Sequence, residues 1–282
     1  MKQILQSFKT GITEVVDVPK PKAKDGCVLI QSQRSLVSSG TERMLLDFSR
    51  SSILSKAKKQ PENVKRVLDK IKTDGILETF DTVWSKLEQP IPMGYSNVGI
   101  VKEVGSGVSQ FKIGDRVVSN GHHAEFICVP KNLCAKILDA VEDDSAVFTV
   151  PSAIALQGIR LVKPTLGETV FVMGLGLIGL LTVQILKAYG CRVIGSDFDS
   201  QKIQIAKNYG IDVCDLSKGE DPVQFALSNS DLGGVDAVII TAATDSNDLI
   251  HQAASMCRKR GRIILVGVIG LNLNREDFYE KE

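Results

Sequence analysis

Several features that would place a protein in a specialised class are missing from this sequence. No apolar run approaches the ~20 residues that a membrane span needs, and the opening stretch MKQILQSFKTG lacks the apolar core of a signal peptide. The net charge is only +1, so we expect neither a nucleic-acid nor a membrane partner. These absences favour a cytoplasmic protein.

Paired cysteines are also missing. The six cysteines are scattered and form no CxxC motif; they are Cys27, Cys128, Cys134, Cys191, Cys214 and Cys257. We expect reduced, buried thiols. The adjacent His122 and His123 suit a solvated turn better than two metal ligands.

Length and patterning predict two domains. The chain has 282 residues, of which 43% are hydrophobic and 24% charged, as is usual for a soluble globular protein. Residues 2–38 and 97–130 have strand patterns, with a turn at 38–42, whereas residues 43–90 carry apolar positions at helical spacing. After a helical pair at 143–162, strands at 170–173, 192–196, 212–214, 235–240 and 262–267 alternate with helices, which indicates a parallel sheet. We expect an α/β protein with a β-rich domain 1–150, interrupted by a helical insertion at about 43–90, and a Rossmann domain 151–282 with a doubly wound parallel sheet.

The most informative stretch is ETVFVMGLGLIGLLTVQILKAYGCRVIGSD, residues 168–197. It gives a strand, a GxGxxG turn, a helix, a second strand and an acid. Gly174 allows the tight turn, Gly176 lets a pyrophosphate approach the backbone, and Gly179 lets the helix pack close to the strand. The helix N-terminus offers free N–H groups to phosphate oxygens.

The acid at the end of the second strand indicates which dinucleotide binds. Asp197 lies 18 positions beyond Gly179, near the spacing of a carboxylate that binds ribose hydroxyls. An acid would repel a 2′-phosphate, and the neighbouring Phe198 is not an arginine, so NAD is favoured over NADP. The expected cofactor-binding residues are Gly174, Gly176, Leu177, Ile178, Gly179, Asp197, Phe198, Lys202, Thr241, Ala242, Val266, Gly267 and Val268. The alternative interpretation of the motif is a structural Gly-rich turn that has lost its ligand. The alternative for Lys202 is an ordinary surface lysine.

A second set of glycines carries a family resemblance. Gly94, Gly99, Gly105 and Val108 have the spacing of the Gly-His-Glu motif of the medium-chain dehydrogenase/reductase superfamily, and GDRV follows at 114–117. The sequence therefore resembles this superfamily, which has the fold of zinc alcohol dehydrogenases. The resemblance implies a GroES-like N-terminal domain and an NAD(P)-dependent, alcohol dehydrogenase-like oxidoreductase.

The sequence departs from that family at the metal. Tyr95 and Ser96 replace the zinc histidine and its glutamate neighbour, and Ser39 replaces the thiolate ligand. The third ligand position falls near residues 149–152, without Cys or His, and a four-cysteine structural zinc lobe is missing. We therefore expect no metal, as in the zinc-independent branch. The turn at 39–42 and the insertion also resemble oxidoreductases fused to a second dehydrogenase domain. The family sheet has six strands, so we expect this chain to be part of a longer polypeptide.

Without zinc, a developing alkoxide needs hydrogen-bond donors. Thr41 and Tyr95 are the expected catalytic donors, with Ser39 as a further candidate, although a packed tyrosine in a turn is an equal interpretation. We expect hydride transfer between NAD and a small-molecule alcohol or carbonyl, in a cleft between the two domains, by a protein that forms a homodimer or carries a fused second oxidoreductase domain. Two alternatives remain: a non-catalytic NAD(H)-binding module and a zinc-independent quinone or enone reductase.

Overall fold

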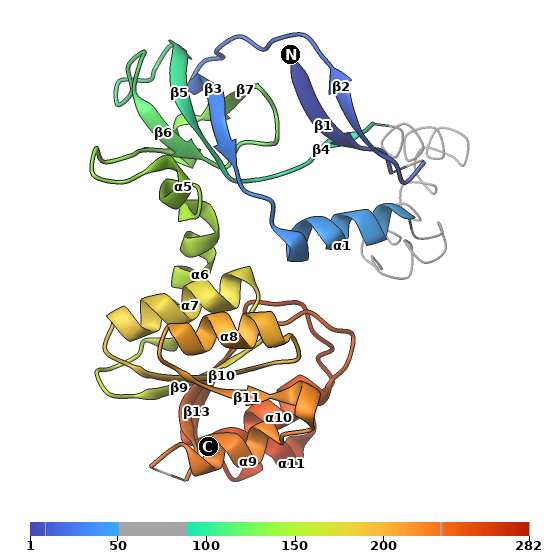
Figure 1. Ribbon diagram of the computed structural model, residues 1–282, viewed down its shortest axis with the longest axis vertical. Helices are drawn as coiled ribbons and strands as arrows, with labels where there is room; N and C mark the ends of the chain where they lie inside the picture. The colour runs from blue at the N-terminus through green and yellow to red at the C-terminus, as the bar shows by residue number, and fades with distance from the viewer. Residues whose placement is uncertain (9, 51–88, 232, 282) are drawn as a thin grey trace, which may run out of the picture. The chain divides into compact units, whose positions relative to one another are not determined.

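The computed structural model describes residues 1–8, 10–50, 89–231 and 233–281 (Figure 1). It divides into two compact units, Met1–Val150 and Pro151–Glu282, here called unit 1 and unit 2. Most of the helical insertion predicted at 43–90 lies outside the described residues. None of the helices in the described stretches combines the length and hydrophobicity that crossing a bilayer requires.

Unit 1 is built on two antiparallel sheets. One has the order β2-β1-β4 and the other the order β7-β3-β5-β6-β8. Their bounds are β1 Lys2–Gln6, β2 Thr13–Asp17, β3 Cys27–Ser35, β4 Ile91–Pro92, β5 Asn97–Val104, β6 Arg116–Ser119, β7 Phe126–Pro130 and β8 Cys134–Lys136. Val28, Ile30, Val101, Val117 and Ile127 form the core of the larger sheet, because alternate residues of each strand face inward.

Short helices complete unit 1 and lead into unit 2. They are α1 Ser39–Arg50, the 3₁₀ turn η1 Lys131–Leu133, and α5 Asp143–Ala146; α6 Thr149–Val162 then crosses the boundary between the units. The turn predicted at 38–42 is wrong, because Ser39 opens α1. Glu42 N–H donates to Ser38 O at 2.9 Å, and Ser38 N–H donates to Glu42 Oε1 at 2.8 Å. Ser, Gly and Thr are as common before a helix as in a turn, and these bonds decide for the helix.

Unit 2 has one parallel five-stranded sheet of order β11-β10-β9-β12-β13. Its strands are β9 Thr169–Met173, β10 Arg192–Asp197, β11 Asp212–Asp215, β12 Val235–Ile240 and β13 Cys257–Leu265. Its helices are α7 Leu177–Ala188, α8 Ser200–Asn208, η2 Leu216–Lys218, α9 Pro222–Ser228, α10 Asp248–Met256 and α11 Arg275–Tyr279. The predicted α/β class, with a β-rich part and a parallel Rossmann sheet, is confirmed. The last strand begins earlier than the predicted 262–267.

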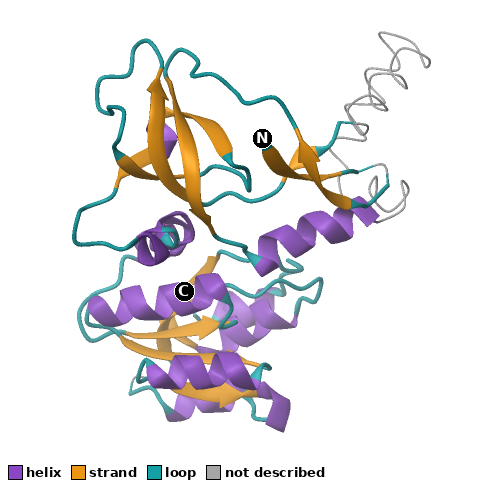
Figure 2. Cartoon of the chain, turned by 45° about the horizontal axis from the view of Figure 1, so that its top comes forward, coloured by secondary structure: helices purple, strands orange, loops and turns teal. Residues whose placement is uncertain are grey.

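Helices cover both faces of the parallel sheet, as Figures 1 and 2 show. Val170 and Val172 of β9 face a core that contains Val183 and Leu186 of α7. The alternate residues Phe171 and Met173 face the opposite core with α9 and α10. A strand buried on both faces is apolar throughout, which is why β9 has the continuous sequence TVFVM.

The six cysteines are free thiols. Cys191, Cys214 and Cys257 are buried as predicted, but Cys27, Cys128 and Cys134 are only half-buried. Removal from water raises the pKa of Cys134 to about 12 and the pKa of Cys257 to about 11. Both groups are therefore protonated near neutral pH.

We expect the core of unit 2 to tolerate truncation poorly. Leu186→Ala removes a fully buried side chain and should lower the free energy of unfolding by about 2–5 kcal/mol. Leu161→Ala in α6 is the matched control, because its side chain is 56% exposed, and should change it by less than about 1 kcal/mol. Urea unfolding followed by circular dichroism measures both; equal effects would contradict this packing.

Candidate functional site

The strand order of unit 2 creates a switch point beside β9. From β9 the chain moves outward to β10 and β11, then returns to β12 on the other side of β9. The connections that leave β9 and β12 run to opposite sides of the sheet, which creates a crevice at the carboxyl ends of these two strands. Ligands bind at such crevices in open α/β sheets. The GxGxxG turn follows β9 at this edge.

The three glycines of this turn have different surroundings. Gly174 has φ +92°, a conformation that favours glycine. A Cβ on Gly179 would lie 2.0 Å from Gly174 O, so the start of α7 packs directly on the turn. A Cβ on Gly176 would meet nothing within 4 Å. Gly176 thus leaves open space at the N-terminus of α7, beside the half-buried Leu177 and Ile178.

Three strand ends meet at this edge. Thr241 Oγ1 donates to Gly174 O at 2.5 Å, and Ala242 N–H donates to Met173 O at 3.0 Å. A Cβ on Gly267 would lie 1.9 Å from Ala242 O. The expected residues after β12 and β13 are thereby brought together with the glycine turn, and Val266 and the 65% exposed Val268 flank Gly267.

Asp197 ends β10 with both carboxylate oxygens held. Oδ2 accepts from Leu175 N–H at 2.7 Å, and Oδ1 accepts from Asp199 N–H at 2.9 Å. Each oxygen has a second lone pair, so the oriented carboxylate can still accept from hydroxyls. Phe198 is 71% exposed beside it. Lys202 pairs with Asp199 Oδ2 at 3.4 Å, and backbone N–H donors from Gln201 and Lys202 lower the Asp199 pKa.

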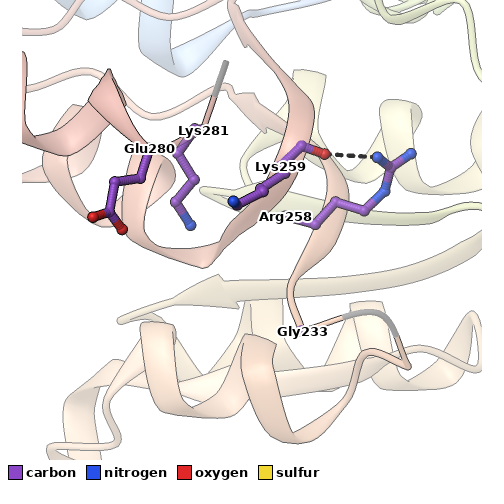
Figure 3. A pocket seen from close by; sticks show the side chains of 5 residues that line it. All are labelled: Gly233, Arg258, Lys259, Glu280 and Lys281. Carbon is purple, nitrogen blue, oxygen red and sulfur yellow. Dashed lines mark hydrogen bonds between the residues drawn. The ribbon is translucent and has the colours of Figure 1, made fainter.

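A hollow of about 450 Å³ lies at the opposite, amino end of β12 and β13, lined by Gly233, Arg258, Lys259, Glu280 and Lys281 (Figure 3). Two of its cations are already engaged. Arg258 Nε is 2.6 Å from Asp236 Oδ1, and Lys281 Nζ donates to Cys257 O at 2.5 Å. The bond from Lys281 fastens the last described residues to β13, whereas the glycine turn lies at the other edge of the sheet.

Unit 1 contains a pocket of about 600 Å³ beside α1. Its described lining combines four apolar and six polar residues, which are Ile4, Thr13, Val37, Ser39, Glu42, Arg43, Leu46, Asp47, Met93 and His123. Small-molecule sites likewise combine apolar surface with polar groups that orient the ligand.

Two of the polar lining residues, Glu42 and His123, belong to a hydrogen-bonded chain that the sequence did not reveal. His123 is 7% exposed, with Nε2 3.1 Å from Glu42 Oε2 and Nδ1 2.9 Å from Ser35 Oγ. The predicted solvated turn is therefore wrong for His123 and holds only for the exposed His122. The Ala-Glu-Phe-Ile pattern after the two histidines marks a strand start, but nothing local in the sequence links His123 to a glutamate 81 positions away.

The predicted catalytic residues occupy different environments. Tyr95 Oη is buried and has no hydrogen-bond partner among the described residues. Ser39 lines the pocket, while Thr41 is exposed in the first turn of α1 and is not among the lining residues. A buried hydroxyl without a partner costs about 1–3 kcal/mol, and such groups often await a water or a ligand.

The two described residues at predicted ligand positions, Ser39 and Tyr95, do not offer the groups that a catalytic zinc requires. Zinc requires thiolate, imidazole or carboxylate ligands, whereas Ser39 and Tyr95 offer a hydroxyl and a phenol. His123 has both ring nitrogens within hydrogen-bond distance of protein oxygens. Within the described ranges, no three His, Cys, Asp or Glu residues cluster as metal ligands would.

Comparisons with known proteins agree with this architecture. Residues 70–140 match the alcohol dehydrogenase GroES-like domain and residues 178–280 match the zinc-binding dehydrogenase family. The (R,R)-butanediol dehydrogenase of Bacillus subtilis is 28% identical over 223 residues, which cover 68% of this chain and 64% of that protein. The match thus spans less than two thirds of the relative's length.

Solved structures extend the likeness in fold. A zinc-binding dehydrogenase from Sinorhizobium meliloti bound to NADP has a TM-score of 0.77 at 22% identity and covers 99% of this chain and 81% of that chain. A short chain alcohol dehydrogenase from E. coli CFT073 complexed with NADH has a TM-score of 0.76 at 21% identity, with coverage of 100% and 81%. The chain belongs to the medium-chain dehydrogenase/reductase superfamily.

Two glycine substitutions should differ in their effect on stability. Gly179→Ala drives a methyl group into Gly174 O and should lower the free energy of unfolding by about 1–3 kcal/mol. Gly176→Ala enters open space at φ −69° and should change it by less than about 1 kcal/mol. Chemical denaturation of both variants checks this; an equally destabilised Gly176→Ala would show that the turn is already filled.

Proposed function

We propose that this protein is an NAD-dependent oxidoreductase that transfers a hydride between nicotinamide and an alcohol or carbonyl compound, sugar-derived compounds included, without catalytic zinc. The observation that carries the proposal is the open backbone at Gly176 beside an oriented Asp197 carboxylate. The name of the butanediol dehydrogenase relative supports an alcohol or carbonyl substrate. When bound, NADH supplies the hydride from C4.

Unit 2 would hold the cofactor. The free N–H groups at the start of α7 would donate to the pyrophosphate, because Gly176 has no side chain to keep it away. Asp197 would accept from the adenosine ribose hydroxyls and would repel a 2′-phosphate. Thr241, Ala242, Gly267 and Val268 would line the nicotinamide side, since they follow β12 and β13 at the same edge.

Unit 1 would hold the substrate and stabilise the oxygen on which negative charge develops. Tyr95 Oη is the strongest candidate donor, because it is buried and lacks a partner among the described residues. Thr41 and Ser39 remain candidates in the first turn of α1. A preformed hydroxyl donor would replace the Lewis acid that the zinc enzymes of this fold use.

Cofactor preference is the first test. We expect NADH to bind more tightly than NADPH, and Asp197→Ala to weaken NADH binding by about tenfold to a hundredfold through lost charge-assisted hydrogen bonds. Asp215→Asn is a matched control, since Asp215 ends β11 in register with Asp197, and should leave affinity unchanged. Titration calorimetry with both cofactors measures this. Equal or tighter NADPH binding would reject the assignment to NAD.

The donor residues are tested by turnover. With an accepted carbonyl substrate, Tyr95→Phe and Thr41→Ala should each lower kcat by on the order of 100-fold, because a transition-state donor is lost, and should leave NADH affinity nearly unchanged. Tyr189→Phe, at an exposed position, is the control. If Tyr95→Phe and Thr41→Ala both turn over the substrate at the parent rate, these residues are structural and not catalytic donors. NADH binding without turnover of carbonyls, quinones or enones would favour a non-catalytic module.

A further inference from the structure

We propose that His123 is a positioning residue that holds the Tyr95 turn and the first turn of α1 in a fixed relation within unit 1. The positioning of Tyr95 does not depend on the proposed function, whereas its expected effect on turnover does. It begins from a feature that the proposed chemistry does not use: a buried imidazole whose two nitrogens both lie within hydrogen-bond distance of side-chain oxygens.

His123 reaches the Tyr95 turn by two direct contacts. Its backbone N–H donates to Met93 O at 2.7 Å. Its ring lies against Gly94, because a Cβ on Gly94 would sit 2.7 Å from three ring atoms. Gly94 has φ +88°, so glycine is required there both for backbone conformation and for space. The neighbouring His122 adds a bond from Nδ1 to Gly94 O at 3.0 Å. The residue before Tyr95 is therefore seated on the imidazole.

The other side of the ring reaches α1. Nε2 lies 3.1 Å from Glu42 Oε2, while Glu42 Oε1 accepts from Ser38 N–H at 2.8 Å. Glu42 thus closes the helix turn that carries Ser39 and Thr41. An ionised carboxylate can only accept, so Nε2 is the donor of this contact whenever Glu42 is ionised. Nδ1 faces Ser35 Oγ at 2.9 Å, where the serine hydroxyl can donate to it.

These contacts connect the first turn of α1 to the turn before Tyr95 through the His123 ring. The buried pair is costly to break, since removal of the imidazole would leave the buried Glu42 Oε2 without this partner. Ser35 and Glu42 fix the orientation of the imidazole ring. The ring in turn fixes the position of Gly94, the residue before Tyr95. Small misplacements of a catalytic donor can cost about a hundredfold in rate, so a rigid support beneath Tyr95 has a kinetic consequence.

The experiment follows Tyr95 directly. Protein labelled with 3-fluorotyrosine should give four fluorine signals, because the chain has four tyrosines, and Tyr95→Phe identifies one of them. His123→Ala should shift or broaden that signal. The matched control is His251→Ala in unit 2, which removes another histidine–carboxylate pair, His251 Nδ1 to Asp277 Oδ2 at 2.5 Å, and should leave the Tyr95 signal in place.

Kinetics supply the second readout. With a carbonyl substrate, His123→Ala should lower kcat by about tenfold to a hundredfold while the NADH dissociation constant stays within about twofold. His123→Gln retains an N–H that can reach Glu42 and should recover part of the rate. If His123→Ala does not fold, Glu42→Gln and Ser35→Ala, which each weaken one ring contact, should move the Tyr95 signal in the same way.

An unmoved Tyr95 signal in folded His123→Ala, or an equal response to His251→Ala, would overturn the inference. A parent protein that turns over no substrate would refute the proposed function instead. In that case the fluorine signals still decide whether His123 positions Tyr95.

Discussion

Burial of Glu42 is the constraint on which the geometry of unit 1 depends. The carboxylate can leave water because Ser38 N–H serves one oxygen and His123 Nε2 serves the other. Since Ser38 precedes α1 and His123 packs on Gly94, the same two bonds fix the start of the helix and the turn before Tyr95. The wall of the pocket beside α1 is thereby assembled from segments that are far apart in the sequence, and Ser39, Glu42 and His123 contribute polar groups to it.

The geometry of unit 2 depends on positions where a side chain is absent. Gly174, Gly179 and Gly267 each occupy a position where a Cβ would collide with backbone of a neighbouring segment, so three strand ends and the start of α7 can converge. Gly176 differs because its missing side chain leaves open space. The contrast separates glycines that the fold needs from the glycine that we propose faces the cofactor, a distinction that the GxGxxG spacing alone does not make.

Local sequence predicted what depends on local physics. The continuous apolar run 170–173 and the glycine turn after it predicted β9 and α7, because buried parallel strands and tight turns have direct compositional signatures. The Ser-Ser-Gly-Thr stretch led to a wrong prediction of a turn, because these residue types favour turns and helix starts alike. The hydrogen bond that decides for the helix is accepted by the Glu42 side chain. The role of His123 could not be predicted, because its partners lie 81 and 88 positions away, one in α1 and one in β3. Family spacing points to Tyr95, but only the folded structure shows that its buried hydroxyl lacks a hydrogen-bond partner among the residues described.

We propose hydride transfer that is supported by a hydroxyl donor in place of a metal ion. Deuterium can be followed from NADH labelled at C4 to a panel of aldehydes and ketones, with zinc determined in the same protein sample. We expect deuterium on the former carbonyl carbon, substoichiometric zinc, and a rate that a chelator leaves unchanged. One tightly bound zinc per chain whose removal abolishes the transfer would contradict this proposal, as would tight NADH binding with no transfer to any member of the panel.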